Sequence, residues 1–423
     1  MATAIVTAGA GARGAYEAGV LSVALPTLLA EGERNIVLVG TSAGALNTAI
    51  VAGAAQPGGD PTGKLRHAWF TLDVDQVFTL NWRSILASGI DFVFKRALHN
   101  YALFNTHPLR KTVTTGGAVT WSTFNQNFED SSWLKVAGVV ATQASSGRST
   151  VFVQGMGNEL PQNNQARGID YVNASLGPGH VLGSAAIPFL FPSESVDGHG
   201  WFMDGGVRLN TPIAPAVDIL TKLWPNEPKP HRILIVSTDP DPEPPPGTTP
   251  NGSGAASRTT ARAIAAGQPD IIDEGATIMY SMFVDRVAED VLSLRRVNAI
   301  VAASAGTPTG VPGHLAKVKD MRVGNRAGQP FQTIDHCYVG PTSRGQIAGA
   351  AGRAFASHQK SWSGSMFARR RLDVVSRALA NRGQSHDEIL SFILFDKGFL
   401  KELFEMGEGH AKSVLKSGIP WRS

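Results

Sequence analysis

The first fifty residues contain one pattern twice: a short apolar run, a glycine-rich turn, and a segment with helical spacing. The apolar runs are Ala4 to Ala8 and Ile36 to Val39. Strands separated by helices of this length form parallel β-α-β units, in which both strands join the same sheet. The pattern therefore predicts an α/β fold whose central, mostly parallel sheet is sandwiched between helices.

Changes in composition predict the domain organisation. We expect a core domain at residues 1–240, in which the aromatic-rich segment 57–133 is inserted as a helical surface cap. Residues 241–268 are rich in proline, glycine and serine, which is typical of a mobile linker. Residues 269–423 are mostly helical in pattern, and we expect them to pack on the core. Further strands are predicted at 134–141, 150–154, 233–237 and 332–339.

Charge and cysteine content exclude several classes of protein. A single cysteine, Cys337, excludes an internal disulfide framework and any multi-cysteine metal site. The net charge of +4 is not concentrated as in nucleic-acid-binding proteins, but it favours contact with an anionic membrane surface. With no signal peptide and no transmembrane stretch, we expect a cytoplasmic or peripheral membrane protein, or one exported without such a signal. The sequence does not define the oligomeric state.

The first turn is a candidate oxyanion hole. It reads Gly9-Ala10-Gly11-Ala12-Arg13-Gly14, the G-x-G-x-x-G spacing of dinucleotide-binding turns. Dinucleotide binding also needs an acidic residue after the second strand, and Val39-Gly40-Thr41-Ser42 has none. Free N–H groups at a helix start can instead stabilise a developing negative charge. Arg13 either adds positive charge there or pairs with Glu17, four residues later.

The second turn carries a candidate nucleophile. Gly40-Thr41-Ser42-Ala43-Gly44 fits G-x-S-x-G, in which a tight strand-to-helix turn exposes the serine oxygen and needs small residues two positions away on either side. Such pentapeptides also occur by chance, but the flanking strand and helix favour a nucleophilic serine. A third motif, Asp204-Gly205-Gly206, follows an aromatic strand and would by itself indicate only a turn.

Together, and in this order, the three motifs resemble the patatin-like phospholipase family. The stretch Ser184 to Pro192 is similar to the S-x-A-x-P-x-x-F-P sequence of that family, and the positions of Asn210 and Pro212 after Asp204 also fit. The family usually has glycine where this chain has Ala10, and alanine does not freely adopt positive φ.

The resemblance implies a lipid acyl hydrolase, of the phospholipase A or lysophospholipase kind. Ser42 would form the acyl-enzyme, Asp204 would act as its base, and residues 9–14 would form the oxyanion hole. The expected substrate is a phospholipid or another acyl-ester lipid, and no cofactor or metal is implied. Two alternatives stay open: a catalytically silent member that binds lipid or protein, and an esterase or thioesterase that acts on soluble acyl substrates.

An ordinary serine-hydrolase triad would require a histidine. His180 and His199 precede Asp204, whereas the hydrolase order Ser, Asp, His places the histidine last. His336 and His386 follow Asp204, but no supporting motif surrounds them. Asp335-His336-Cys337 has no second ligand cluster, so we interpret it as a strand edge and not as a metal site. We therefore expect a dyad of serine and aspartate.

Overall fold

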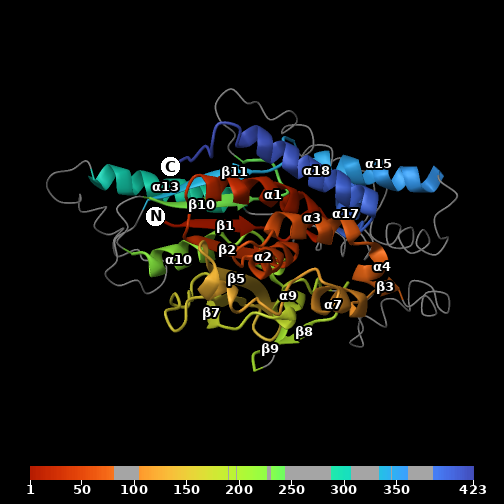
Figure 1. Cartoon of the computed structure of the whole chain (residues 1–423), viewed down its shortest axis with the longest axis horizontal. Helices are drawn as coiled ribbons and strands as arrows, with labels where there is room; N and C mark the ends of the chain where they lie inside the picture. Colours follow the sequence, from red (N-terminus) through yellow and green to blue (C-terminus); the bar gives the residue numbers. More distant parts are fainter. Residues whose placement is uncertain are drawn as a thin grey trace, which may run out of the picture.

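The central sheet of the protein has the strand order β11-β10-β1-β2-β5-β6-β7, with β9 paired to β5 and β8 to β9 (Figure 1). A computed structural model describes residues 1–80, 104–188, 190–196, 198–225, 230–242, 287–305, 333–343, 345–360 and 384–423. The strands of this sheet are β1 (Thr3–Thr7), β2 (Ile36–Thr41), β5 (Leu134–Gln143), β6 (Ser149–Gln154), β7 (Ile169–Asn173), β8 (Glu194–Val196), β9 (Gly200–Asp204), β10 (His231–Val236) and β11 (Ile334–Val339). A separate antiparallel pair is formed by β3 (Thr79–Leu80) and β4 (Phe104–Asn105).

Helices connect and cover these strands. Those before Asp204 are η1 (Gly11–Arg13), α1 (Gly14–Ala30), α2 (Ala43–Gly53), α3 (Pro61–Thr71), α4 (Val74–Val77), α7 (His107–Thr114), α8 (Asn127–Asp130) and α9 (Pro178–Ser184). Those after it are η2 (Gly205–Val207), α10 (Ile213–Leu223), α13 (Val287–Ala305), α15 (Gln346–Lys360), α17 (Gln384–Ile393) and α18 (Lys397–Val414).

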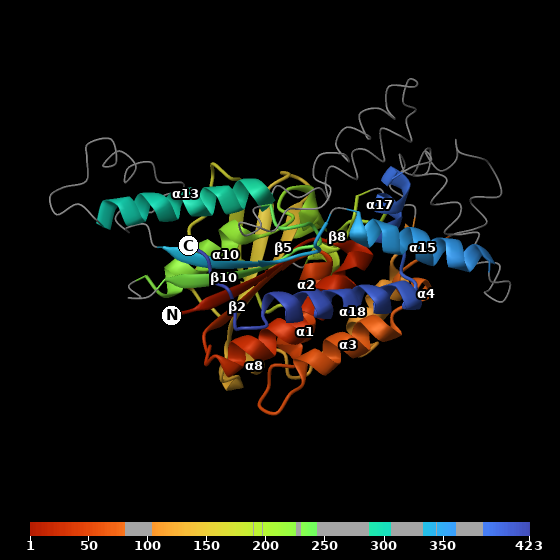
Figure 2. The ribbon, with the colours of Figure 1, turned by 90° about the horizontal axis from the view of Figure 1, so that it is seen from above.

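Helices lie on both faces of the sheet, with α10 and α13 on one face and α1, α3 and α18 on the other (Figure 2). Successive side chains of a strand point to opposite faces, so an apolar strand feeds two cores. On β2, Ile36 and Leu38 join the core beneath α1, whereas Val37 and Val39 join the core beneath α10. Strands β11, β10, β1, β2 and β5 run parallel. The predicted α/β fold is thus confirmed.

The other half of the sheet was not predicted as such. β6 runs antiparallel to β5, and β7 runs parallel to β6. β9 also runs antiparallel to β5, and it pairs with residues 141–143 beyond the end of β2. These pairings join segments up to about sixty residues apart, and a local hydrophobic pattern does not reveal the partner of a strand.

The aromatic residues expected in a surface cap belong to the core where the structure describes them. Trp69, Phe78 and Phe104 are buried, and α3 packs against α1 and α2. Four other aromatic residues of the cap and most of the predicted linker lie outside the described residues: Trp82, Phe92, Phe94, Tyr101 and the segment 243–268.

The C-terminal region contributes directly to the main fold. β11 extends the sheet next to β10, and α18 lies along α1 (Figure 1). The division at residues 240 and 269 stays a prediction. One sheet and one core include residues from both sides of it. Among the helices that the structure describes, none is both long and apolar enough to cross a bilayer.

Candidate active site

Sheet register brings the second and third sequence motifs together. β2 and β9 occupy the same edge of β5, since β6 takes the other edge. Thr41, the last residue of β2, pairs with Val140, and Asp204, the last residue of β9, pairs with Ala141. The ends of the two strands therefore meet at neighbouring residues of β5, which places Ser42 beside Asp204.

Ser42 lies on a strained turn between β2 and α2. Its φ of 54° and ψ of −120° make it the one non-glycine residue with positive φ in the described part of the chain. The flanking glycines are required by close packing, as the motif predicts: a Cβ at Gly40 would lie 2.3 Å from the Gly44 oxygen, and one at Gly44 would lie 2.5 Å from the Thr7 oxygen. Strain of this kind costs about 1–3 kcal/mol and is typical of functional sites.

The Asp204 carboxylate accepts a hydrogen bond directly from the serine. The distance from Ser42 Oγ to Asp204 Oδ2 is 2.6 Å, and Gly206 N donates to Oδ1 at 2.7 Å. Ser42 is 2% exposed and Asp204 1%. Burial raises the pKa of Asp204 to about 7, although the hydrogen bonds from Ser42 and Gly206 act in the opposite direction. A base with a pKa near neutrality suits proton transfer at physiological pH.

Ser184, at the end of α9, fixes the backbone of Ser42. Its Oγ accepts from Ser42 N at 2.8 Å and donates to the Val140 oxygen at 2.5 Å. The next turn of the chain supports the aspartate, because Asp204 N donates to the Ala186 oxygen at 2.8 Å. In the sequence this stretch is recognisable only as similar to a family signature, and its hydrogen bonds give it a physical role in positioning both residues.

The glycine-rich turn approaches the serine from β1. Gly11 adopts a positive φ of 53°, whereas Ala10 has a φ of −142° that alanine adopts without strain. The alanine in the middle of the motif is thus compatible with the turn. Glu17 accepts from Ala8 N at 2.8 Å, and the Asn210 oxygen accepts from Gly9 N at 3.0 Å. The N–H groups at the start of η1 have no partner within their own helix and suit an anion.

Arg13 contacts the C-terminal helix α17. Its Nε donates to Ser391 Oγ at 2.7 Å, its Nη2 forms an ion pair with Glu388, and its guanidinium stacks 3.8 Å from the Phe392 ring centroid. The structure thus pairs Arg13 with Glu388 of α17, whereas one of the two sequence-based alternatives paired it with Glu17. Its charge is compensated by Glu388, and this pairing links the glycine-rich turn to the C-terminal region.

In the folded structure, no described candidate histidine lies between the side chains of Ser42 and Asp204, which are directly hydrogen-bonded. The His180 ring packs against Phe152, its Nδ1 accepts from Gly177 N, and burial lowers its pKa to about 4. His199 is exposed at the turn between β8 and β9.

Of the two histidines after Asp204, His336 lies away from the Ser42–Asp204 pair, and the side chain of His386 is not described. His336 lies on β11, three strands from β2, and is level with Val37 instead of Ser42. The side chain of His386 lies outside the described residues.

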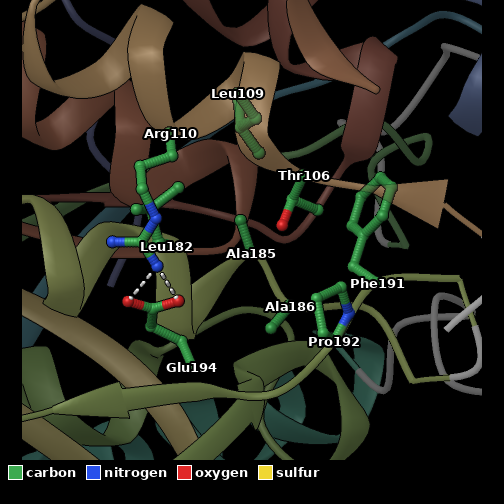
Figure 3. A pocket seen from close by; sticks show the side chains of 9 residues that line it. All are labelled: Thr106, Leu109, Arg110, Leu182, Ala185, Ala186, Phe191, Pro192 and Glu194. Carbon is green, nitrogen blue, oxygen red and sulfur yellow. Dashed lines mark hydrogen bonds and ion pairs between the residues drawn. The ribbon is translucent and has the colours of Figure 1, made fainter. Parts of the chain in front are cut away.

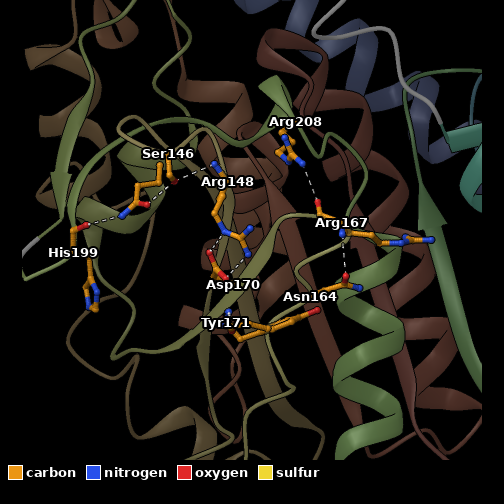
Figure 4. A network of polar contacts seen from close by, with 10 residues as sticks. Ser146, Arg148, Asn164, Arg167, Asp170, Tyr171, His199 and Arg208 are labelled. Atoms are coloured by element: carbon orange, nitrogen blue, oxygen red, sulfur yellow. Dashed lines mark hydrogen bonds and ion pairs between the residues drawn. The ribbon is translucent and has the colours of Figure 1, made fainter. Parts of the chain in front are cut away.

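The loop after Asp204 is held at two adjacent residues, Arg208 and Leu209. Thr41 Oγ1 donates to the Leu209 oxygen at 3.1 Å, and Arg208 Nη2 donates to the Arg167 oxygen at 3.1 Å. Figure 4 shows this second contact beside the bidentate pair of Arg148 and Asp170, which joins the residue before β6 to β7. The contacts of Leu209 and Arg208 anchor the loop to β2 and to the segment before β7.

A hollow adjoins the segment that supports Asp204 (Figure 3). An ion pair between Arg110 and Glu194 closes one end. Arg110 Nη2 lies 2.6 Å from Glu194 Oε1 and 2.5 Å from Oε2. The Ala186 carbonyl that holds Asp204 N belongs to a lining residue. The apolar wall is formed by Leu109, Leu182, Ala185, Ala186, Phe191 and Pro192.

Comparison with known families decides how this arrangement is classified. A model of patatin-like phospholipases matches residues 5–217, which is just over half of the chain and includes all three motifs. The chain belongs to the patatin-like phospholipase family. The resemblance inferred from the motifs is confirmed, and the protein is a member of a family of lipid acyl hydrolases.

More distant comparisons add little to the family match. The crystal structure of VipD from Legionella pneumophila is 11% identical, with 97% of this chain and 67% of VipD covered at a TM-score of 0.30. A TM-score this low supports no conclusion about fold or function. No curated protein matches the chain.

Two parts of the site were missed by sequence reasoning. Asn210 was noticed only for its spacing, although its side chain is buried beside Gly9 and Gly206. The contact of α17 with Arg13 joins residues more than 370 positions apart, and no local signal in the sequence indicates it.

Proposed function

We propose that this protein hydrolyses carboxylic esters of lipids, with Ser42 as the nucleophile and Asp204 as the general base. The observation that carries the proposal is the 2.6 Å hydrogen bond from Ser42 Oγ to Asp204 Oδ2 in a buried site. The strained backbone of Ser42 and the raised pKa of Asp204 support these roles.

In the first half of the reaction, Ser42 Oγ attacks the ester carbonyl carbon while its proton passes to Asp204. The N–H groups of Gly11 and Ala12, within the predicted oxyanion hole at residues 9–14, stabilise the oxyanion of the tetrahedral intermediate. The carbon–oxygen bond to the alcohol breaks, and the alcohol leaves with the proton from Asp204. Water then repeats the sequence on the acyl-enzyme, which releases the carboxylic acid and restores Ser42.

We propose phospholipids or lysophospholipids as the substrate class. The net charge of +4 would favour a peripheral encounter with anionic membranes. Family membership supports the lipid ester itself.

A substrate panel tests the proposal. The wild-type protein and Ser42→Ala are incubated with vesicles of phosphatidylcholine or phosphatidylglycerol, with micelles of lysophosphatidylcholine, with p-nitrophenyl butyrate and with an acyl thioester. Released acid is quantified. Ser195→Ala, a change at an exposed serine on β8, is the matched control. We expect acid release from at least one lipid, at the wild-type rate in the control and below about 1% of it in Ser42→Ala.

Other outcomes separate the alternatives. Hydrolysis of soluble esters without hydrolysis of any lipid would contradict the substrate class. Turnover above about 1% in Ser42→Ala would contradict the nucleophile. No hydrolysis of any substrate, with no reaction of Ser42 toward a fluorophosphonate, would indicate a silent member that only binds.

A further inference from the structure

A third polar side chain lies at the Ser42–Asp204 pair. Asn210 is 9% exposed, and its backbone oxygen accepts from Gly9 N at 3.0 Å. A Cβ at Gly9 would lie 2.3 Å from Asn210 Oδ1 and 3.4 Å from Ser42 Cβ. A Cβ at Gly206 would lie 2.9 Å from the same Oδ1 and 3.0 Å from Asp204 Oδ1. The amide oxygen therefore lies near Ser42 Cβ and near Asp204 Oδ1, the carboxylate oxygen that accepts from Gly206 N.

Asn210 Oδ1 is a buried acceptor without a hydrogen-bond partner among the described residues. Leaving such an atom unsatisfied costs about 1–3 kcal/mol, so buried acceptors normally have a partner. Ser42 cannot donate to this oxygen, because its single hydroxyl hydrogen is already donated to Asp204. A reactant that enters the site with a hydrogen of its own would satisfy this buried acceptor.

The two half-reactions differ in the number of hydrogens on the attacking group. Ser42 and a competing alcohol each have one hydroxyl hydrogen, which Asp204 accepts. Water has two hydrogens, so Asp204 can accept only one of them, and the other needs a second acceptor in a buried site. An unsatisfied amide oxygen beside the base meets this need for water alone.

We propose that Asn210 Oδ1 accepts the second hydrogen of the water that hydrolyses the acyl-enzyme, and so favours water over alcohols as the acyl acceptor. This inference rests on the proposed function. The water oxygen forms a bond to the acyl carbon, one hydrogen passes to Asp204 and then to Ser42 Oγ, and the bond from Oγ to the acyl carbon breaks. The hydrogen held by Asn210 stays on the carboxylic acid that leaves.

The test measures how the acyl-enzyme divides between water and an alcohol. The protein is acylated with p-nitrophenyl butyrate in the presence of 1-propanol, and propyl butyrate and butyric acid are quantified. The ratio of the two products does not depend on how much of a variant is folded. Asn210→Leu fills a similar volume without an acceptor, Asn210→Asp keeps an acceptor oxygen, and Asn173→Leu makes the same change at an exposed asparagine on β7.

We expect the ratio of ester to acid to rise about fivefold in Asn210→Leu, as loss of one hydrogen bond to the attacking water predicts. It should stay within about twofold of the wild-type ratio in Asn210→Asp and Asn173→Leu. Asn210→Ala, in which the acceptor is also absent, should change the ratio in the same direction as Asn210→Leu.

An unchanged ratio in Asn210→Leu and Asn210→Ala, while nitrophenol release still depends on Ser42, would overturn this inference and leave the proposed function intact. If Ser42→Ala released nitrophenol at the wild-type rate, both the inference and the proposed function would be overturned.

Discussion

At the scale of single residues, Asp204 combines a requirement of the proposed chemistry with a cost in stability. Burial among β5, β9 and the loop after Asp204 raises its pKa to about 7, which leaves the carboxylate partly ionised at neutral pH. The same burial penalises the ionised form, because a charge removed from water loses solvation that two hydrogen bonds do not fully restore. The folded protein therefore contains a destabilising group at its proposed active site.

This cost predicts that Asp204→Asn stabilises the protein. In the folded state the pKa is about 7, against an ordinary value of 3.8, so the unfolded chain releases the Asp204 proton at lower pH than the folded chain. The penalty is absent below pH 3.8, grows up to pH 7 and is complete above it. We expect the free energy of unfolding at pH 8 to be about 1–4 kcal/mol higher in the variant.

Denaturant unfolding at pH 8 and pH 4 checks this prediction. The gain should be much smaller at pH 4, where the folded wild type binds the proton and the unfolded chain binds it about half of the time. Asp170→Asn is a matched control on β7, since the carboxylate of Asp170 is partly exposed and paired with Arg148. The quantity that decides is the free energy of unfolding of Asp204→Asn minus that of the wild type. If this difference were smaller at pH 8 than at pH 4, burial would not raise the pKa of Asp204.

At the scale of elements, local patterns predicted the pieces of the site but not how they meet. The strand, turn and helix around Ser42 follow from periodicity and from glycines that only a tight turn requires. The position of Asp204 depends on β9 pairing with β5 beyond the end of β2, and pairing between distant segments is not encoded in either segment alone. The role of α17 has the same origin, because its contact with Arg13 forms only in the folded chain.

The position of α17 predicts that Arg13 contributes mainly to the stability of the fold and little to the stabilisation of the oxyanion. Arg13→Ala would leave the Glu388 carboxylate, 21% exposed, without its partner and would remove the stacking on Phe392. We expect a loss of about 2–3 kcal/mol in the free energy of unfolding. Arg66→Ala, at a half-exposed arginine paired with Glu408, should cost less than about 1 kcal/mol.

Thermal unfolding of both variants, with Glu388→Gln as a second disruption of the same pair, checks this prediction. Equal losses in Arg13→Ala and Arg66→Ala would contradict a structural role for the contact with α17.

At the scale of the whole molecule, the first and last long helices hold the chain together. α1 and α18 approach so closely that a Cβ at Gly407 would lie 2.1 Å from the Tyr16 oxygen, and one at Gly19 would lie 2.0 Å from the Phe404 oxygen. The sequence predicted two helices here and packing of the C-terminal region on the core. Their direct contact was not predictable, because glycine inside a helix usually signals weak helical propensity and not close packing.

This contact predicts opposite effects for the same substitution at two positions of α18. Gly407→Ala should destabilise the protein by about 1–3 kcal/mol, because the helices must separate to accept the methyl group. Gly409→Ala meets nothing within 4 Å and should stabilise by up to about 1 kcal/mol through helix propensity. Thermal unfolding followed by circular dichroism measures both changes. Equal effects at the two positions would contradict the close approach of α1 and α18.

The account depends most on the claim that Asp204, without a histidine, activates Ser42. The rate at which a fluorophosphonate labels Ser42, followed by intact mass and peptide mapping, measures this activation without knowledge of the substrate. The account predicts labelling at Ser42 that falls about tenfold per pH unit below pH 7. Labelling should be at least about 100-fold slower in Asp204→Asn and unchanged in His180→Ala, His199→Ala, His336→Ala and His386→Ala. Loss of labelling in a folded histidine variant, or labelling of Asp204→Asn at the wild-type rate, would contradict it.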